Sequence, residues 1–367
     1  MQILQPTLRL GRDVWDRANL PEEEFRARVD RLRAAMRDRG LDVLLLYGNG
    51  LDECGYPTYV SNYTVKLPFA ALVIMPLEGD LVLMFEGSTR GRSAAQATTW
   101  IDDVRPCWNI AETCAVVLAE KGLGRAAIGL AGIERLMPYD QLDLLRATLG
   151  GARCVDAEAF VDQIRSVKSD RELNLVKSAS RIVRQTLQGI ETVHFEPVIE
   201  AFIAARLIYD ARMQGAEDVR VMIADPLDNE LSFRPADDRL IAESACVVVL
   251  CRASWERYWA EEIRTYRVRS GRLESASSEA DRAWFDSVIK GFVPGRTVRE
   301  SLGDLIPCCT VHGTGVTAVE PPILPQDHAT RLRAGMCLSI CATRTSVGGG
   351  ATVLGETFVI GTPPLRI

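Results

Sequence analysis

Residues 160–190 read FVDQIRSVKSDRELNLVKSASRIVRQTLQGI, with apolar residues at helical spacing along the whole stretch. Ser169 is a candidate N-cap, and Glu172, three residues later, completes a capping box. We predict one long helical segment here. Because the residues before it have a different pattern, we place a domain boundary just ahead of it, which gives domains of residues 1–157 and 158–367.

The residues before this stretch predict an α/β domain. Helical patterns cover residues 21–40, 111–121 and 139–149, and strand-like runs cover 43–47, 69–75, 81–85 and 126–130. Helices and strands that alternate in this way are typical of an α/β fold.

The residues after this stretch predict an α+β domain with a mostly antiparallel sheet. A helical pattern at 197–214 opens with Pro197, which suits a first helical position, and a second helical pattern covers 278–292. Strand-like runs occupy 219–223, 245–251, 262–268, 336–340 and 352–360.

Composition narrows the class of protein. The chain has 367 residues, of which 47% are hydrophobic and 25% charged, and a net charge of −6 without any block of Lys or Arg. We therefore expect no nucleic-acid partner. Apolar runs such as 245–251 are too short to cross a bilayer, and the first residues lack the apolar core of a signal peptide. We therefore expect no membrane partner. The ten scattered cysteines predict reduced thiols in a cytoplasmic protein.

Seven short motifs follow one another along the chain. They are IRSVKSDRE at 164–172, DRLI at 238–241, YWAEEIRTY at 258–266, FVPGRT at 292–297, HGTG at 312–315 with EPP at 320–322, GMCLSI at 335–340 and GETFVI at 355–360. In this order they resemble the catalytic domain of the pita-bread superfamily, in the branch of creatinase, prolidase and aminopeptidase P. The resemblance implies an α+β pita-bread catalytic domain preceded by a smaller, creatinase-type α/β domain.

That resemblance also implies a site. The fold usually holds two divalent metal ions with two aspartates, a histidine and two glutamates, and here those positions fall on Leu250, Glu261, His312, Cys341 and Glu356. Leu250 cannot bind a metal, so we expect no dinuclear centre and no metal cofactor. The alternative is one divalent ion held by the other four side chains. A further substrate-facing histidine of the family falls near Ser232, where this chain has none.

The retained titratable groups indicate acid–base chemistry. His312 is the expected general acid or base. Creatinase, a metal-free member, is similar in keeping two glutamates where Glu261 and Glu356 fall. We expect these two carboxylates to face each other, to share a proton and to hold a cationic nitrogen. A Cys341–His312 nucleophile is the less favoured alternative, since cysteine is more often a small buried apolar residue.

The remaining candidates would contact substrate. The predicted substrate-binding residues are Cys341, Tyr258, Arg264, Ser232 and Leu250, although Arg264 is also suited to a structural role.

The functional hypothesis is a creatinase-like, metal-independent enzyme that acts on a C–N bond of a small amino-acid-like or amidine substrate. Hydrolysis, elimination, decarboxylation and ring closure all remain open. The resemblance implies a homodimer in which the first domain covers the neighbour's pocket. The rival hypotheses are a one-metal hydrolase and a non-catalytic binding protein of the same fold.

Overall fold

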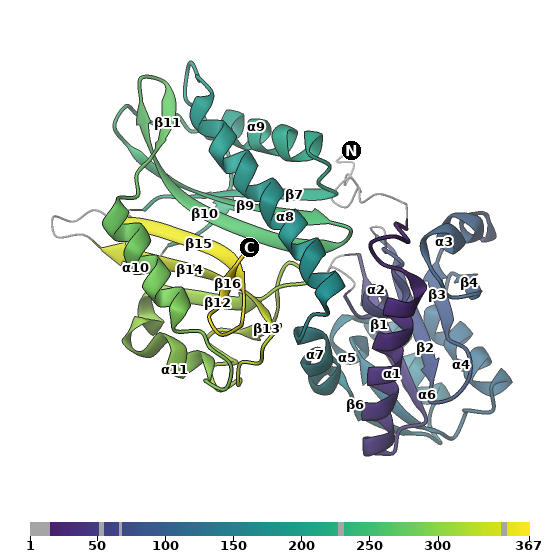
Figure 1. Ribbon diagram of the computed structural model, residues 1–367. Helices are drawn as coiled ribbons and strands as arrows, with labels where there is room; N and C mark the ends of the chain where they lie inside the picture. The colour runs from purple at the N-terminus through teal and green to yellow at the C-terminus, as the bar shows by residue number, and fades with distance from the viewer. Residues whose placement is uncertain (1–14, 51–54, 66–67, 227–230, 346–350) are drawn as a thin grey trace. The chain divides into compact units, whose positions relative to one another are not determined.

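The computed structural model describes residues 15–50, 55–65, 68–226, 231–345 and 351–367. It divides into two compact units, Met1–Arg165 and Ser166–Ile367, which are coloured purple to teal and teal to yellow in Figure 1. Within the described residues, no helix is both long and apolar enough to span a membrane.

The first unit contains a mixed six-stranded sheet in the order β4-β3-β2-β1-β5-β6. Its strands are β1 (Val43–Asn49), β2 (Ala70–Pro76), β3 (Val82–Glu86), β4 (Asp103–Cys107), β5 (Ala127–Ala131) and β6 (Arg153–Asp156). Its helices are α1 (Glu22–Arg39), α2 (Gly55–Ser61), α3 (Arg92–Thr98), α4 (Ile110–Glu120), α5 (Ile133–Leu136) and α6 (Tyr139–Thr148), followed by α7 (Glu158–Ser166). The predicted α/β class is confirmed.

The prediction of one helix across residues 160–190 is wrong. Helix α7 ends at Ser166, and α8 (Asp170–Gly189) begins after Ser169. The Ser169 Oγ accepts a hydrogen bond from the Glu172 amide at 3.2 Å, and the Glu172 carboxylate accepts one from the Ser169 amide at 2.8 Å. The predicted capping box is thus confirmed, and it starts a new helix instead of continuing the first.

Pro197 is not the first residue of a helix, which corrects a second prediction. Helix α9 runs from Glu200 to Met213, and Ile199 before it is extended and forms a β-bridge with Leu240. A long-range backbone pairing therefore delays the start of the helix beyond the proline.

The second unit is built on a ten-stranded sheet in the order β13-β12-β14-β15-β10-β9-β7-β8, with β11 paired to β10 and β16 to β15. Its strands are β7 (Asp218–Ala224), β8 (Arg234–Pro235), β9 (Cys246–Trp255), β10 (Tyr258–Arg269), β11 (Arg272–Ser275), β12 (Cys309–Gly313), β13 (Glu320–Ile323), β14 (Cys337–Thr345), β15 (Ala351–Val359) and β16 (Leu365–Arg366). Their pairings are antiparallel, so the predicted α+β class is confirmed.

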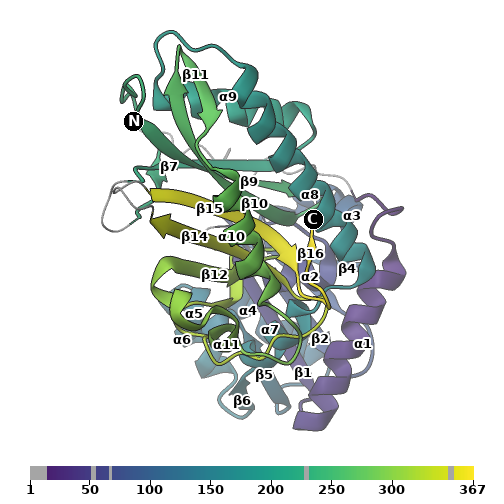
Figure 2. The ribbon, with the colours of Figure 1, turned by 60° about the vertical axis from the view of Figure 1, so that its left-hand side comes forward.

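Helices cover one face of this sheet, as Figure 2 shows for α8 and α10 (Glu279–Lys290). Ile182 and Val183 of α8 pack with Val249 and Cys251 of β9 in one buried cluster. A second cluster joins α10 and the short helix α11 (Val298–Leu302) to β12, β14 and β15. We call this side the helix-covered face and the other side the opposite face. Since side chains alternate along a strand, neighbouring residues of β10 point to different faces.

Candidate functional site

An ion pair lies on the opposite face, at the centre of the long β9–β10 hairpin. Arg252 and Glu261 are register partners, and the Arg252 Nε donates to Glu261 Oε2. The side chains are only 18% and 4% exposed, respectively. A guanidinium that is directly hydrogen-bonded to a buried carboxylate favours the ionised form of that carboxyl group.

His312 of β12 completes this group. Its Nε2 lies 3.2 Å from Glu261 Oε1 and 3.3 Å from Arg252 Nη2. In sheet order β12 is three strands away from β10, which in a flat sheet would be roughly 14 Å. The contact therefore requires a strongly curled sheet, which brings a histidine from one end of the sheet onto a pair from the middle.

The neighbouring charges determine the ionisation of Glu261. Burial on its own raises the pKa of this carboxyl group, but the charges of His312 and Arg252 and their hydrogen bonds outweigh burial and lower its pKa to about 2. Glu261 is therefore a carboxylate at neutral pH.

His312 has a partner for each of its protonation states. Its Nδ1 lies 2.8 Å from the Gly313 carbonyl oxygen, to which only an N–H can donate. In the neutral ring the Nε2 lone pair can then accept from Arg252, and in the charged ring the Nε2–H can donate to Glu261. A ring that is stabilised in both forms is suited to transferring a proton.

An apolar cluster adjoins these three residues. It contains Ala224, Val248, Leu250, Ile263, Cys341 and Val353, with Met222, Leu231 and Phe233 packed against it. Cys341 is buried, and burial together with the nearby Glu261 charge raises the pKa of its thiol far above the usual range. A thiol that remains protonated argues against the Cys341 nucleophile.

Glu356 lies elsewhere, and the expectation that it faces Glu261 is wrong. It is the register partner of Glu262, on the helix-covered face, and its carboxylate accepts from Arg366. Its neighbour Thr357 lies toward Glu261 instead, since the Thr357 Oγ1 accepts from the Glu261 amide at 2.9 Å. A shift of one residue along β15 is enough to change the face.

Of three other predicted residues, two contact groups other than His312 and the third is exposed. The Tyr258 hydroxyl is buried and donates to Glu172 Oε1 at 2.9 Å, which ties β10 to the start of α8. Arg264 donates to Glu262 at 2.7 Å, on the helix-covered face. Ser232 is exposed, while Leu231 and Phe233 beside it pack against the apolar cluster. The structure thus brings together Glu261 and His312, with Leu250 and Cys341 nearby.

Arg252 is the residue that the sequence analysis missed. The sequence contains the information that identifies it, because the turn at 255–258 joins two strands in which residue 252 falls opposite residue 261. Reading the register of that hairpin would have placed a cation directly beside Glu261.

The residues on this face do not fit a metal ion. Across the described ranges, no three His, Cys, Asp or Glu side chains gather in a way that could hold one. Leu250 offers no ligand atom, and the guanidinium of Arg252 occupies an oxygen of Glu261. The four-ligand set of the one-ion alternative is not formed here, because Glu356 lies on the other face from Glu261 and His312.

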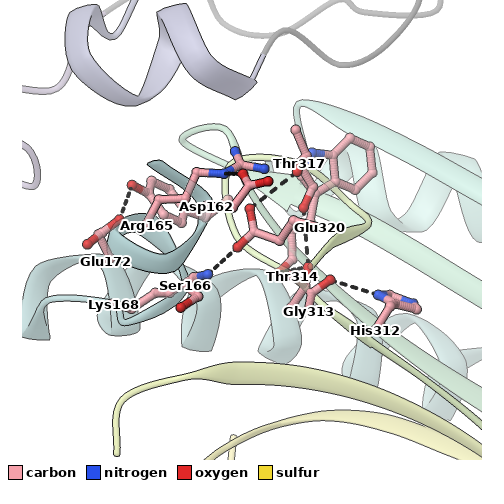
Figure 3. A network of polar contacts seen from close by, with 12 residues as sticks. Asp162, Arg165, Ser166, Lys168, Glu172, His312, Gly313, Thr314, Thr317 and Glu320 are labelled. Carbon is pink, nitrogen blue, oxygen red and sulfur yellow. Dashed lines mark hydrogen bonds and ion pairs between the residues drawn. The ribbon is translucent and has the colours of Figure 1, made fainter. Parts of the chain in front are cut away.

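A second polar network supports the turn after His312 (Figure 3). Lys168 and Glu320 form an ion pair in which each side chain is 2% exposed, and the Thr317 hydroxyl donates to the same carboxylate at 3.3 Å. A side chain at Gly315 would come within 2.7 Å of both Glu320 Oε1 and Lys168 Cε. The turn thus packs closely against this buried ion pair, which supports the backbone that follows His312.

Comparison with known proteins agrees with this architecture. Residues 28–167 match the family described as Creatinase/Prolidase N-terminal domain. The chain is 25% identical to the uncharacterized peptidase YqhT of Bacillus subtilis over 232 residues, which are 57% of this chain and 65% of the relative. It is 24% identical to the Xaa-Pro dipeptidase of Pyrococcus horikoshii, over 57% of this chain and 64% of the relative. The chain therefore spans just under two thirds of the length of these relatives.

A shorter match concerns the ectoine hydrolase of Halomonas elongata, which is 25% identical over 44% of this chain and 42% of the relative. Solved structures extend the likeness over nearly the whole chain. The X-Pro aminopeptidase from Thermotoga maritima superposes with a TM-score of 0.75 at 17% identity, over 92% of this chain and 96% of that one. The prolidase from Pyrococcus horikoshii gives 0.71 at 19% identity, over 92% and 96%. The predicted two-domain fold, creatinase-type and then pita-bread, is confirmed.

Proposed function

We propose that this protein is a hydrolase that cleaves a C–N bond in a small, amino-acid-like substrate, with His312 and Glu261 as its acid–base pair. The observation that carries the proposal is the position of His312 Nε2, 3.2 Å from a buried carboxylate and 3.3 Å from a guanidinium. Support comes from the names of the relatives, which are peptidases, dipeptidases and a hydrolase.

Arg252 favours a substrate that carries a carboxylate. The Glu261 carboxylate already accepts a hydrogen bond from Arg252, so a cationic amidine would have to compete with that guanidinium for it. An Arg guanidinium binds a carboxylate through two parallel hydrogen bonds, which gives both affinity and orientation. We therefore assign the anchoring of the substrate to Arg252, in place of the expected grip on a cationic nitrogen.

The chemistry follows from the two states of His312. When the substrate carboxylate engages Arg252, the Nη2 contact to His312 is released and the Nε2 lone pair becomes available. It takes a proton from a water molecule whose oxygen attacks the carbon of the C–N bond. The charged ring is stabilised by Glu261, and it then returns the proton to the nitrogen as the C–N bond breaks.

The test is a substrate screen with matched histidine variants. N-acyl amino acids, dipeptides with proline, ureas and cyclic amidines would be offered to the wild type, to His312→Ala and to His194→Ala, whose histidine is exposed. Turnover of the best substrate should fall about 10²–10⁴-fold in His312→Ala, the usual worth of a positioned acid or base. It should stay at the wild-type rate in His194→Ala. Full turnover by His312→Ala would refute the proposed mechanism.

The same screen addresses two rivals. A non-catalytic binding protein is favoured by the engagement of both Glu261 oxygens, which leaves that carboxylate fully paired. It would bind a carboxylate ligand saturably without turnover, and binding would survive His312→Ala. For the one-metal rival, turnover would disappear with a chelator and return with a divalent ion, whereas the proposed mechanism predicts no change in either case.

A further inference from the structure

A second cavity lies on the helix-covered face of the catalytic sheet. Its volume is about 580 Å³, within the range of small-molecule sites. Strands β10 and β15 form its floor, and residues of α8, α10 and β16 also line it. His312 and Arg252 are not among its lining residues, so it is separate from the site proposed above.

Glu356 lines this cavity, and one of its two carboxyl oxygens has no hydrogen-bond partner. The residue is 6% exposed, and Arg366 donates to its Oε2, but its Oε1 is buried without a hydrogen bond. Leaving a buried carboxylate oxygen unsatisfied is costly, and native proteins generally provide such an atom with a donor. Glu356 is a lining residue of the cavity, so a donor bound in the cavity is placed to supply the hydrogen bond that this oxygen lacks.

The other acidic groups around the cavity are already paired. Glu262 accepts from Arg264 at 2.7 Å, Glu191 lies 3.5 Å from the same arginine, and Asp286 accepts from Arg366. Among the four acidic residues of the lining, Glu356 is thus the one with a buried oxygen that accepts no hydrogen bond.

The cavity lining also contains an exposed cation, Arg282. Arg282 of α10 lines the same cavity and is exposed, and the hydrogen bond of its guanidinium goes to the neutral Ser277 hydroxyl at 3.3 Å. In contrast, Arg264 and Arg366 are each shared between two carboxylates, and Arg184 lies 3.9 Å from Glu262 and donates to the Ile367 carbonyl oxygen. The cavity lining therefore contains a buried carboxyl oxygen without a donor and, in Arg282, an exposed cation whose hydrogen bond goes to a neutral group.

We propose that this cavity binds a small zwitterion, whose ammonium group donates to Glu356 Oε1 and whose carboxylate pairs with Arg282. Four arginines and four acidic residues line the cavity, so a molecule without net charge keeps the lining balanced. A free cation or a free anion would satisfy only one of the two open groups. The proposal does not depend on the hydrolase activity proposed above.

Calorimetric titration of the full-length protein tests the proposal. The probes are 4-aminobutyrate, 5-aminovalerate and 6-aminohexanoate, which differ only in the distance between ammonium and carboxylate. Butylamine and butyrate are the matched single-charge controls. We expect saturable binding by at least one amino acid of the series, at least about tenfold tighter than either control, as expected for the loss of one charged hydrogen bond.

Four variants locate the binding. Glu356→Gln and Arg282→Gln should each weaken binding about tenfold or more, and Arg282 is exposed, so its replacement does not threaten the fold. Glu279→Gln, an exposed acid on the same helix but outside the lining, and His312→Ala should bind as the wild type does.

Three results would overturn the proposal. The first is no saturable binding by any of the three amino acids up to about 50 mM, far above the roughly millimolar Kd of a weak complex. The second is butylamine or butyrate binding as tightly as the best zwitterion. The third is binding that survives Arg282→Gln or is lost in His312→Ala, which would place the probe elsewhere.

Discussion

Replacing Arg252 with Gln should destabilise the protein through Glu261, which would remain buried with one charged partner fewer. The two neighbours lower the pKa of Glu261 from 4.5 to about 2 in spite of burial. At about 1.4 kcal/mol per pH unit they stabilise the folded state by about 3 kcal/mol at neutral pH. Arg252 is one of two partners and is partly exposed, so we expect Arg252→Gln to cost about 2 kcal/mol, somewhat less than the usual cost of breaking a fully buried pair.

The stability lost in Arg252→Gln should depend on pH in a defined direction. The pKa of Glu261 is lower in the folded state than in the unfolded state, so its stabilising contribution is complete above pH 4.5 and is lost as the pH falls toward 2. The stability difference between wild type and Arg252→Gln should therefore shrink between pH 7 and pH 3. Replacing Glu261 with Gln in the Arg252→Gln variant should recover part of the lost stability, because no buried carboxylate then lacks its arginine partner.

The assay is urea denaturation at both pH values, followed by tryptophan fluorescence. Arg267→Gln is the control, since Arg267 lies on the same hairpin but is exposed. The reasoning is refuted if Arg252→Gln changes the free energy of unfolding by less than about 0.5 kcal/mol at pH 7, the range of ordinary surface substitutions. It is also refuted if the difference is as large at pH 3.

Three further predictions concern other parts of the molecule. Lys168→Met should lower the free energy of unfolding by about 3–5 kcal/mol, because it leaves the buried Glu320 carboxylate without its cation. In the same denaturation assay, Lys168→Met/Glu320→Gln should be more stable than the single variant. Cys341→Ser should retain kcat on any substrate that the screen identifies, since a buried, protonated thiol does not act as a nucleophile. Loss of turnover in a folded variant would support the Cys341 nucleophile instead. Sedimentation should find a homodimer with twofold symmetry, and a monomer at about micromolar concentration would contradict that assembly.

The sequence predicted elements whose causes are local. The capping box of Ser169 and Glu172 needs only four consecutive residues, and the structure contains it. The break between α7 and α8 has a distant cause, because Val167 pairs with Met336 and the Lys168 amide donates to the Gly335 carbonyl. A pairing between residues more than 160 positions apart leaves no trace in helical periodicity, so one continuous helix was the natural but wrong reading.

The candidate site shows the same division between local and distant causes. His312 and Glu261 were found because each lies in a motif that could be matched residue by residue. Glu356 was placed at the wrong site because matching a motif does not fix which of two adjacent residues faces inward, and one residue decides the face in a strand. Arg252 was missed because its role comes from the register of the hairpin and from the curl of the sheet, not from a motif.

Arg252 and Leu250 together explain how this face can keep a buried carboxylate. A carboxylate as buried as Glu261 needs a positive partner, and here the chain itself supplies one through the guanidinium of Arg252. A guanidinium remains protonated at any pH at which the protein is folded, so it can hold an anion in place but cannot accept a proton from water. In the proposed mechanism the proton then goes to His312, whose Nε2 lies within 3.3 Å of both charged groups. In the proposed mechanism, the arginine therefore sets the sign of the substrate group that is bound, and the histidine is the group that transfers the proton.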